Sequence, residues 1–372
     1  MKRRSFLQSI PLAGIGFATG LPLTGGSQTA SPQRRRAPVL HVADCFHPHG
    51  DPDDHFDLAC EYALSHLGHI DLRGIVIDYP PSFRAGDPAV MAVAQLNWLT
   101  AQAVPVAVGT SKRLTTSTDK MEGADKRELA GVQFILRQLR QSEQPLSIIC
   151  VGSAADVIVA ALREPELFRT KCAGVYLNSG AAYDQPEKPE ALEFNVKLDK
   201  AAYAAMFKLP CPLYWFPCWH TVETRVSGTE GTFFRMPHKE ALSEVSKELA
   251  NYFQFMFDRN WNPKWLRAMN TAPDAAAWAA TLGRTREMWS TASQFIVAGL
   301  TVTRDGAIVP IDQAGDAAIF RMCPVEVTCK DSGHTTWRYQ EKETGIWKLS
   351  ITDASLYPAA MTKAIATLLK SL

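Results

Sequence analysis

Short apolar runs alternate with amphipathic segments along most of the chain. The runs lie at residues 39–43, 70–77, 104–108, 146–151, 174–177 and 212–217. Segments with apolar side chains at helical spacing follow them, at 54–67, from 87 onward, around 129–139, and at 154–163 and 199–207. Continuous apolar strands that alternate with helices are typical of a parallel sheet covered on both faces. The predicted fold is therefore α/β, with a mostly parallel central sheet and helices on both faces.

Two of these helices carry specific expectations. The helix over 54–67 is predicted to place Leu67 on its apolar face, because this residue continues the helical spacing of the apolar positions. The second helix is predicted to begin with Asp87 as N-cap and Pro88 in its first turn. In that helix Val90 is expected to point inward.

The strand order places several loops on one rim. Ligands of parallel sheets bind beyond the carboxyl ends of the strands, so the segments after Ala43, Val151 and Leu177 are expected to lie together. Residues 221–291 are rich in aromatic side chains, and their apolar positions recur at helical spacing. This pattern predicts a helical cap region over that rim. The remaining chain alternates like short strands and ends in a helix predicted over 359–369.

Composition limits the classes of function. The chain has 372 residues, 46% of them hydrophobic, which is enough for one large domain with a sizeable core. Its net charge is +1, and no basic stripe interleaved with aromatic side chains occurs, so we predict no nucleic-acid partner. The eight cysteines form no metal-binding CxxC pattern. A disulfide framework is not required, and a single disulfide bond stays an open alternative.

The N-terminal segment predicts export. Paired arginines at positions 3 and 4 precede Phe-Leu and a mild apolar stretch over 10–23 that is interrupted by Gly and Pro. The segment resembles a twin-arginine signal peptide and is short for a membrane span. The predicted location is periplasmic or secreted, with no stable membrane anchor. The predicted parts are a signal peptide over 1–30, a linker over 31–38 and one α/β domain over 39–372.

Acidic side chains crowd the segment after the first predicted strand. Five carboxylates lie within fourteen residues, at positions 44, 51, 53, 54 and 57. Such charges repel one another unless a cation neutralises them, and hard oxygen ligands suit Ca²⁺ or Mg²⁺. The alternative is that Asp53 and Asp54 only cap the following helix while the other carboxylates face solvent.

Four motifs stand in order along the chain. Asp44 is followed by Asp-Pro-Asp-Asp at the start of a helix, and later come the segments 151–156, 174–181 and 193–195. In order and spacing they resemble the inosine-uridine nucleoside hydrolase family. The three later segments are similar to that family's Gly-Pro-Leu-Thr-Asn turn, its strand ending in Met-Gly-Gly, and its Glu-Phe-Asn segment. The similarity runs from about residue 39 to 216, and more weakly to the C-terminus, and implies a nucleoside-hydrolase-like fold.

The resemblance implies hydrolysis of N-glycosidic bonds in ribonucleosides or related ribosyl compounds. In that family a Ca²⁺ ion holds a water molecule and the ribose 2′- and 3′-hydroxyls, and an aspartate takes the proton from the water. Metal and carboxylate together generate the nucleophile, and surrounding anionic charge favours the developing sugar cation. The match implies Ca²⁺ as cofactor and a small-molecule nucleoside or riboside as partner, and leaves homo-oligomer formation open. The implied base is Asp44, the implied metal ligands are Asp44, Asp54 and the backbone oxygen of Ala155, and the implied substrate contacts are Asp53, Asn178, Glu193 and Asn195.

The sequence departs from the family pattern in two places. Asp44 lies nine residues before the Asp-Asp pair, and the longer loop includes His47 and His49. Asp51 is therefore an alternative base, although Asp44 is favoured because it closes the strand. The family's His-Asp pair, which supplies an acid for the leaving group and a calcium ligand, has no counterpart in the aligned stretch 286–291.

Two other functions stay open. Asp44 with His47 and His49 is a candidate transition-metal centre, since paired histidines suit zinc or similar ions. The missing His-Asp pair is also compatible with an exported protein that binds nucleosides or sugars without hydrolysing them. Candidate acids for the leaving group, if the chain is a hydrolase, are His49, His55 and His220.

Overall fold

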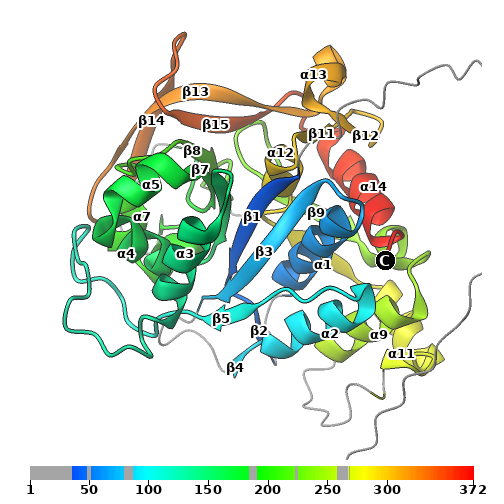
Figure 1. The fold of residues 1–372 in the computed structure, drawn as a ribbon. Helices are drawn as coiled ribbons and strands as arrows, with labels where there is room; N and C mark the ends of the chain where they lie inside the picture. The colour runs from blue at the N-terminus through cyan, green and yellow to red at the C-terminus, as the bar shows by residue number, and fades with distance from the viewer. Residues whose placement is uncertain are drawn as a thin grey trace, which may run out of the picture. The chain divides into compact units, whose positions relative to one another are not determined.

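Strand β1 (Ala37–Ala43) lies in the interior of a nine-stranded sheet, the largest sheet among the described residues (Figure 1). The computed structural model describes residues 36–47, 52–78, 87–183, 191–222, 225–257, 267 and 269–372. The signal peptide predicted over 1–30 lies outside these residues. The strands, in spatial order, are β14 (Thr335–Tyr339), β13 (Phe320–Cys329), β15 (Ile346–Ile351), β8 (Leu213–Phe216), β7 (Cys172–Asn178), β6 (Leu146–Val151), β1, β3 (Ile70–Ile77) and β5 (Val106–Val108).

The sheet is mostly parallel, which confirms the predicted fold class. Every neighbouring pair from β15 to β5 is parallel, whereas β13 pairs antiparallel with both β14 and β15. All positions of β6 are buried, and all but the first of β1. A strand that is covered on both faces needs apolar side chains at nearly every position, which explains the continuous apolar runs.

The chain changes direction across the sheet beside β1. It adds β3 and β5 on one side of β1, and later adds β6, β7 and β8 on the other side. The carboxyl ends of β1 and β6 therefore flank a topological switch point, where open α/β sheets bind ligands. Val42 is paired with Cys150, and Val151 with Asn178. The segments after β1, β6 and β7 thus share one rim, as predicted.

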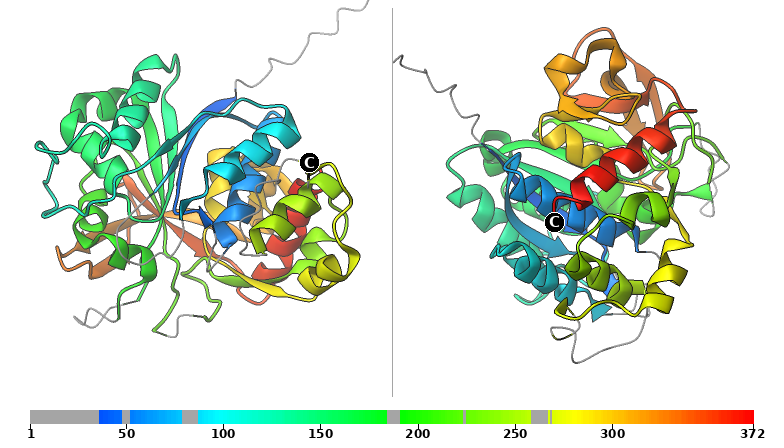
Figure 2. Two further views of the ribbon diagram at one scale, coloured as in Figure 1. Left: turned by 90° about the horizontal axis from the view of Figure 1, so that it is seen from below. Right: turned by 90° about the vertical axis from the view of Figure 1, so that its right-hand side faces the viewer.

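Helices cover the two faces of the sheet (Figures 1 and 2). On one face the core includes side chains from six helices, and on the other face from five. The first group comprises α1 (Asp53–His66), α2 (Val90–Thr100), α8 (His238–Leu242), α9 (Lys247–Phe257), α12 (Ala292–Val297) and α14 (Tyr357–Leu369). The second group comprises α3 (Ala130–Gln141), α4 (Ala155–Arg163), α5 (Pro165–Lys171), α6 (Phe194–Leu198) and α7 (Lys200–Met206).

Helix α1 is buried on all sides. Every residue from Asp53 to Ser65 is buried, because α2 and α14 cover the helix on the side away from the sheet (Figure 2). The prediction that Leu67 belongs to its apolar face was wrong: this residue is the C-cap of α1 and is 48% exposed. The spacing of apolar positions alone does not show where a helix ends.

The predicted start of the second helix was also wrong. Asp87 and Pro88 form a short strand, β4, that pairs antiparallel with β2 (Phe46–His47) in the loop after β1. Helix α2 begins only at Val90, with Ala89 as N-cap, and Val90 is 37% exposed. An Asp-Pro pair is compatible with both roles, and here a contact with a distant segment decides between them.

Residues 221–291 contain more than the predicted helices. Helices α8 (His238–Leu242), α9 (Lys247–Phe257) and α11 (Ala275–Leu282) are joined by a two-stranded ribbon of β9 (Phe234–Pro237) and β10 (Thr285–Met288). Helix α9 packs against α2, and α8 packs against α14. These helix contacts fix the β9–β10 ribbon relative to α2 and α14, and the ribbon in turn positions the segment that follows β10.

The rest of the chain completes the sheet and the helical layer. A small ribbon of β11 (Leu300–Val302) and β12 (Ile308–Pro310) leads into α13 (Ile311–Ala314), and the last helix ends at Leu369. The eight cysteines are all free thiols. Within the ranges given above, none of the helices combines the length and apolar character that a membrane span requires.

Candidate functional site

Two carboxyl groups meet at the switch point of the sheet. Asp44 directly follows β1, and Asp54 lies in the first turn of α1. Their side chains are hydrogen-bonded to each other, and the charge of Asp53 acts on the same pair. All three residues are buried. The structure therefore brings together three of the residues that the sequence singled out.

This arrangement changes the protonation of Asp54. Burial raises the pKa of its carboxyl well above the usual range, and the charges of Asp44 and Asp53 raise it further. A hydrogen bond between two carboxyl groups requires a shared proton, because an ionised carboxylate only accepts. Without that proton the two charges would repel in a region that excludes water. The pair therefore needs either a proton or a cation.

Asp78 is a further carboxylate of the rim that sequence reasoning missed. It follows β3, is 1% exposed, and the charge of Asp44 acts on it. Its carboxylate accepts hydrogen bonds from Ser153 N (2.6 Å) and Ser153 Oγ (2.7 Å). Burial raises its pKa to about 7, although the Ser153 bonds act in the opposite direction. Its place at the end of a strand next to β1 was the only signal in the sequence.

The turn between β6 and α4 closes the other side of the switch point. Gly152 has φ 112°, and Ala154 adopts the left-handed conformation with φ 65°. A side chain on Gly152 would meet Asp78 Oδ2 at 2.6 Å and Asp44 Cβ at 3.0 Å, so only glycine fits between these aspartates. Ala155, the predicted backbone ligand, is the first residue of α4. Strained turns of this kind are concentrated at functional sites.

The Glu-Phe-Asn segment lies at the start of α6 and contacts the end of β7. Glu193 is the N-cap of α6, and its carboxylate accepts hydrogen bonds from Ser179 Oγ and from the backbone N–H groups of Gly180, Asn195 and Val196. Its side chain is buried and not a surface charge. Burial raises its pKa, and these donors lower it.

Asn178 and Asn195 are linked across the same rim. The side-chain amide of Asn195 donates to the backbone oxygen of Asn178 at 3.1 Å. Asn178 is fully buried at the end of β7, and its Nδ2 donates to Tyr176 O (3.2 Å) and Cys150 O (3.4 Å). Its Oδ1 has no hydrogen-bond partner among the described residues. A hydroxyl group of a ligand, or a water molecule, could donate a hydrogen bond to this buried acceptor.

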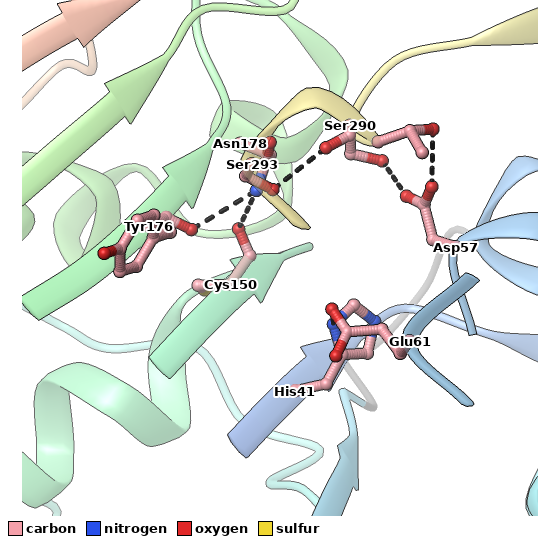
Figure 3. Close-up of polar contacts among 9 residues, drawn as sticks. His41, Asp57, Glu61, Cys150, Tyr176, Asn178, Ser290 and Ser293 are labelled. Atoms are coloured by element: carbon pink, nitrogen blue, oxygen red, sulfur yellow. Dashed lines mark hydrogen bonds and ion pairs between the residues drawn. The ribbon is translucent and has the colours of Figure 1, made fainter. Parts of the chain in front are cut away.

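The stretch that lacks the His-Asp pair is bound to helix α1 instead (Figure 3). Ser290 Oγ and Thr291 Oγ1 donate to the two carboxylate oxygens of Asp57, the latter at 2.7 Å. Burial raises the pKa of Asp57 to about 6, against the effect of these hydroxyls. One turn further along α1, Glu61 lies 3.3 Å from His41 Nδ1 of β1, with both side chains completely buried.

The candidate histidines have different surroundings. His55 is completely buried in α1, with Nε2 3.2 Å from Cys45 Sγ. His220 follows β8, and its Nδ1 accepts a hydrogen bond from Glu230 N at 3.3 Å. His47 lies in β2, whereas His49 and Asp51 are outside the described residues.

Side chains that bind metals do not form a larger cluster in the described ranges. No group of three or more His, Cys, Asp or Glu residues in them is arranged to hold a metal ion. The predicted ligand set is of another type, because it combines the carboxylates of Asp44 and Asp54 with a backbone oxygen at Ala155. The structure places all three residues beside the switch point.

The sequence is similar to a curated bacterial enzyme over part of its length. The pyrimidine-specific ribonucleoside hydrolase RihA of Salmonella choleraesuis (strain SC-B67) is 27% identical over 149 residues, which are 40% of this chain and 46% of that protein. The matched region thus spans a little under half of that relative.

Solved structures show the same fold at low sequence identity. The purine-preferring ribonucleoside hydrolase from Gardnerella vaginalis has a TM-score of 0.50 at 14% identity, over 89% of this chain and 99% of that one. The type III effector protein XopQ, in complex with adenosine diphosphate ribose, has a TM-score of 0.50 at 13% identity, over 91% and 94%. The family model described as inosine-uridine preferring nucleoside hydrolase matches residues 49–355. Since this match covers most of the domain, the chain belongs to the inosine-uridine preferring nucleoside hydrolase family.

Proposed function

We propose that the protein hydrolyses the N-glycosidic bond of ribonucleosides or related ribosyl compounds, with a divalent hard cation at the Asp44–Asp54 pair. The observation that carries the proposal is the hydrogen bond between these two buried carboxyl groups at the switch point of the sheet. Such a pair is unfavourable unless a proton or cation lies between its oxygens. Family membership supports the class of reaction.

The residues at the pair fit Ca²⁺. Asp44 and Asp54 supply hard carboxylate oxygens, and Ala155 would add a backbone oxygen, which are the donor types that Ca²⁺ prefers. The remaining positions of a six- to eight-coordinate ion would be taken by water and sugar hydroxyls. When bound, such a cation lowers the pKa of a water molecule and polarises it for attack.

The side chains around the pair have separate tasks in this proposal. Asp44 accepts the proton of the attacking water, and Asp53 binds a ribose hydroxyl. Asn178, Glu193 and Asn195 bind the sugar from the opposite side of the rim. The concentration of carboxylates stabilises the positive charge that develops on the sugar ring as the base departs.

Cation binding and turnover test the proposal together. Calorimetric titration of the purified protein with Ca²⁺ should give one site, and Asp54→Asn should abolish it along with hydrolysis of p-nitrophenyl riboside. Asp199→Asn is a matched control, because Asp199 is also buried with a raised pKa but caps α7. A Ca²⁺ affinity that is unchanged in Asp54→Asn would contradict the proposed site.

Two alternatives have their own discriminating results. A binding protein without turnover is favoured by the absence of the His-Asp pair, since Ser290 and Thr291 bind Asp57 instead. It would bind ribose or nucleosides and release no base. A transition-metal hydrolase that uses Asp44, His47 and His49 would instead retain stoichiometric zinc after purification without added metal.

We also propose that the protein is exported through the twin-arginine pathway, on the basis of the paired arginines at positions 3 and 4. Replacing both by lysine should leave the protein in the cytoplasm. Cell fractionation measures this directly, and equal periplasmic yield from both forms would refute the proposal.

A further inference from the structure

One face of α1 carries three buried acidic side chains in succession. Asp54, Asp57 and Glu61 are spaced at three and four residues, so they lie on one side of the helix. Asp54 belongs to the rim, while Asp57 and Glu61 lie one and two turns deeper, and both are 0% exposed. Buried carboxylates destabilise a protein unless they are paired or hydrogen-bonded, so the deeper two require partners.

Asp57 finds its partners in the segment between β10 and α12. Ser290 Oγ donates to one carboxylate oxygen and Thr291 Oγ1 to the other, at 2.7 Å for Thr291 (Figure 3). Both hydroxyl groups are buried. Because each carboxylate oxygen has its own donor, the rotation of the Asp57 side chain is fixed from two sides.

The donor segment is itself fixed to the sheet. Ser293 Oγ donates to Ser290 O at 3.0 Å, which closes the first turn of α12, and α12 packs on β6 and β7. On the other side, Thr232 Oγ1 donates to Trp289 O, while Thr232 N donates to Pro217 O at 2.8 Å. The two hydroxyls that hold Asp57 therefore have a defined place relative to β6, β7 and the end of β8.

A second contact ties α1 to β1 below this point. His41 Nδ1 lies 3.3 Å from Glu61 Oε1 (Figure 3). Asp44 follows three residues after His41 on the same strand. Helix α1 thus contacts β1 at His41–Glu61 and again at Asp44–Asp54. Between these two contacts, Asp57 binds the helix to the β10–α12 segment.

We propose that Asp57, held by the Ser290 and Thr291 hydroxyls, is a positioning residue that fixes the first turn of α1 and thereby the carboxylates of Asp53 and Asp54. In this chain the Ser290–Thr291 segment places none of its own side chains at the rim. It acts on the rim carboxylates indirectly, by holding Asp57. The inference rests on the proposed function only for its effect on cation binding and turnover; the fixed helix turn is a separate, measurable consequence.

The test uses hydroxyl deletions that conserve shape. Ser290→Ala with Thr291→Val removes both donors, while Thr291→Ser alone keeps a hydroxyl. Thr303→Val is the matched control, because Thr303 Oγ1 is also bonded to an aspartate, Asp305, but in the turn between β11 and β12. Amide hydrogen exchange of the full-length protein reports on residues 53–57 without any need for activity.

In the double variant we expect exchange in the first turn of α1 to accelerate about 10- to 100-fold, the effect of losing the net contribution of two hydrogen bonds. Ca²⁺ affinity should fall about 10- to 100-fold, the usual effect of removing groups that orient metal ligands. The kcat for p-nitrophenyl riboside should fall with it while KM changes little. Thr291→Ser should remain within about twofold of the wild type for each quantity, and Thr303→Val should leave all of them unchanged.

Three results separate the inference from its alternatives. A lower melting temperature with unchanged exchange in residues 53–57 would overturn it, because the bonds would then be merely structural. Unchanged Ca²⁺ affinity despite faster exchange would also overturn it. If the wild type neither binds Ca²⁺ nor hydrolyses ribosides, the proposed function fails. The exchange measurement alone then decides the inference. Unchanged exchange rates in the first turn of α1 in the double variant refute it.

Discussion

The carboxyl group of Asp44 at the end of β1 is hydrogen-bonded to that of Asp54 in the first turn of α1. Burial and neighbouring charge keep the pKa of Asp54 high, so the cation-free pair retains a proton. A cation that binds between these oxygens must displace that proton. Apparent Ca²⁺ affinity should therefore rise with pH.

Proton release can be measured directly. Calorimetry in two buffers with different ionisation enthalpies should give a net release of up to about one proton per Ca²⁺ near neutral pH. Asp54→Asn should show neither binding nor release. Ca²⁺ affinity that does not change with pH would mean that the pair is already ionised without a cation, which contradicts the raised pKa of Asp54.

The pH dependence of stability follows from the same buried carboxylates. The folded-state pKa values of Asp57 and Asp78 are raised to about 6 and about 7. A raised acidic pKa gives stability that is complete below the unfolded pKa and is lost as pH rises through the folded value. The cation-free protein should therefore become less stable as the pH rises from about 4, the usual pKa of an aspartate, to about 7, by up to about 1.4 kcal/mol per pH unit for each of these carboxyl groups.

Thermal unfolding at several pH values checks this slope. Asp78→Asn should flatten it between about pH 4 and 7, because one group with a raised pKa is removed. Asp305→Asn should not, since Asp305 is an exposed carboxylate whose pKa is lowered. Stability that increases steadily from about pH 4 to 7 would show that these aspartates ionise without penalty.

The sheet was predictable from the sequence because its strands are locally encoded. Strands β3 and β6 match the predicted limits, since buried parallel strands are apolar at consecutive positions. The pairing of Asp87 and Pro88 with the β1 loop was not predictable, because an Asp-Pro pair also suits a helix start.

The site was predictable only where its residues follow strands or motifs. Asp44, Asp53 and Asp54 lie together as expected. The partners of Asp57 are 233 and 234 residues away in the chain, and no local pattern connects them. Asp78 was missed because a single aspartate after a strand is common, and only its bonds to Ser153 distinguish it.

Gly131→Ala should destabilise the protein although it lies in helix α3. Alanine in a helix is normally favoured over glycine by about 1 kcal/mol. Here a Cβ at residue 131 would lie 2.5 Å from Asp156 Oδ1, a buried carboxylate that accepts a hydrogen bond from Thr110 N. We expect the steric clash to outweigh the helix propensity and to lower the free energy of unfolding by about 1–3 kcal/mol.

Gly123→Ala is the control, because nothing lies within 4 Å of a Cβ at that position. Urea unfolding of both variants gives the comparison. A Gly131→Ala protein as stable as the wild type would show that Asp156 can move without loss.

Asn195→Ala and Glu193→Ala should differ in stability although both are predicted to bind the sugar. Glu193 accepts four hydrogen bonds and caps α6, so its removal should lower the free energy of unfolding by about 1–3 kcal/mol. The side chain of Asn195 makes one hydrogen bond within the described part of the chain, to Asn178 O, and the residue is only partly buried. Its replacement should leave stability nearly unchanged but weaken ribose binding by about 1–3 kcal/mol.

Paired measurements of unfolding and of ribose affinity separate the two effects. Asn195→Ala is the decisive variant, since a loss of affinity there cannot be attributed to unfolding. Unaltered ribose affinity in Asn195→Ala would remove this residue from the substrate site.

The leaving group gives the last prediction. No histidine occupies the stretch from Arg286 to Thr291, so acid assistance from that segment is missing. Of the other candidates, His55 is completely buried beside Cys45. His220 has its Nδ1 bonded to Glu230 N, which leaves the proton of a neutral ring on Nε2.

Aromatic stacking is the remaining way to assist a departing base. Trp219, which follows β8, and Trp289, which follows β10, are the candidates. Stacking stabilises a flat base without protonating it. Substrates with good leaving groups should then react faster, so p-nitrophenyl riboside should exceed inosine and uridine by about 10²–10⁴-fold in kcat, the usual contribution of a general acid.

Steady-state kinetics on the purified protein decide between these cases, and His220→Gln identifies the acid if one exists. If inosine reacts as fast as the nitrophenyl substrate and His220→Gln slows only inosine, His220 is a working acid through its Nε2 proton, and the prediction of a missing acid is wrong. If both substrates slow equally, His220 acts on the fold or on binding, because the nitrophenyl group departs without protonation. If neither substrate reacts while ribose still binds, the missing acid has left a binding protein, and the hydrolase proposal is refuted.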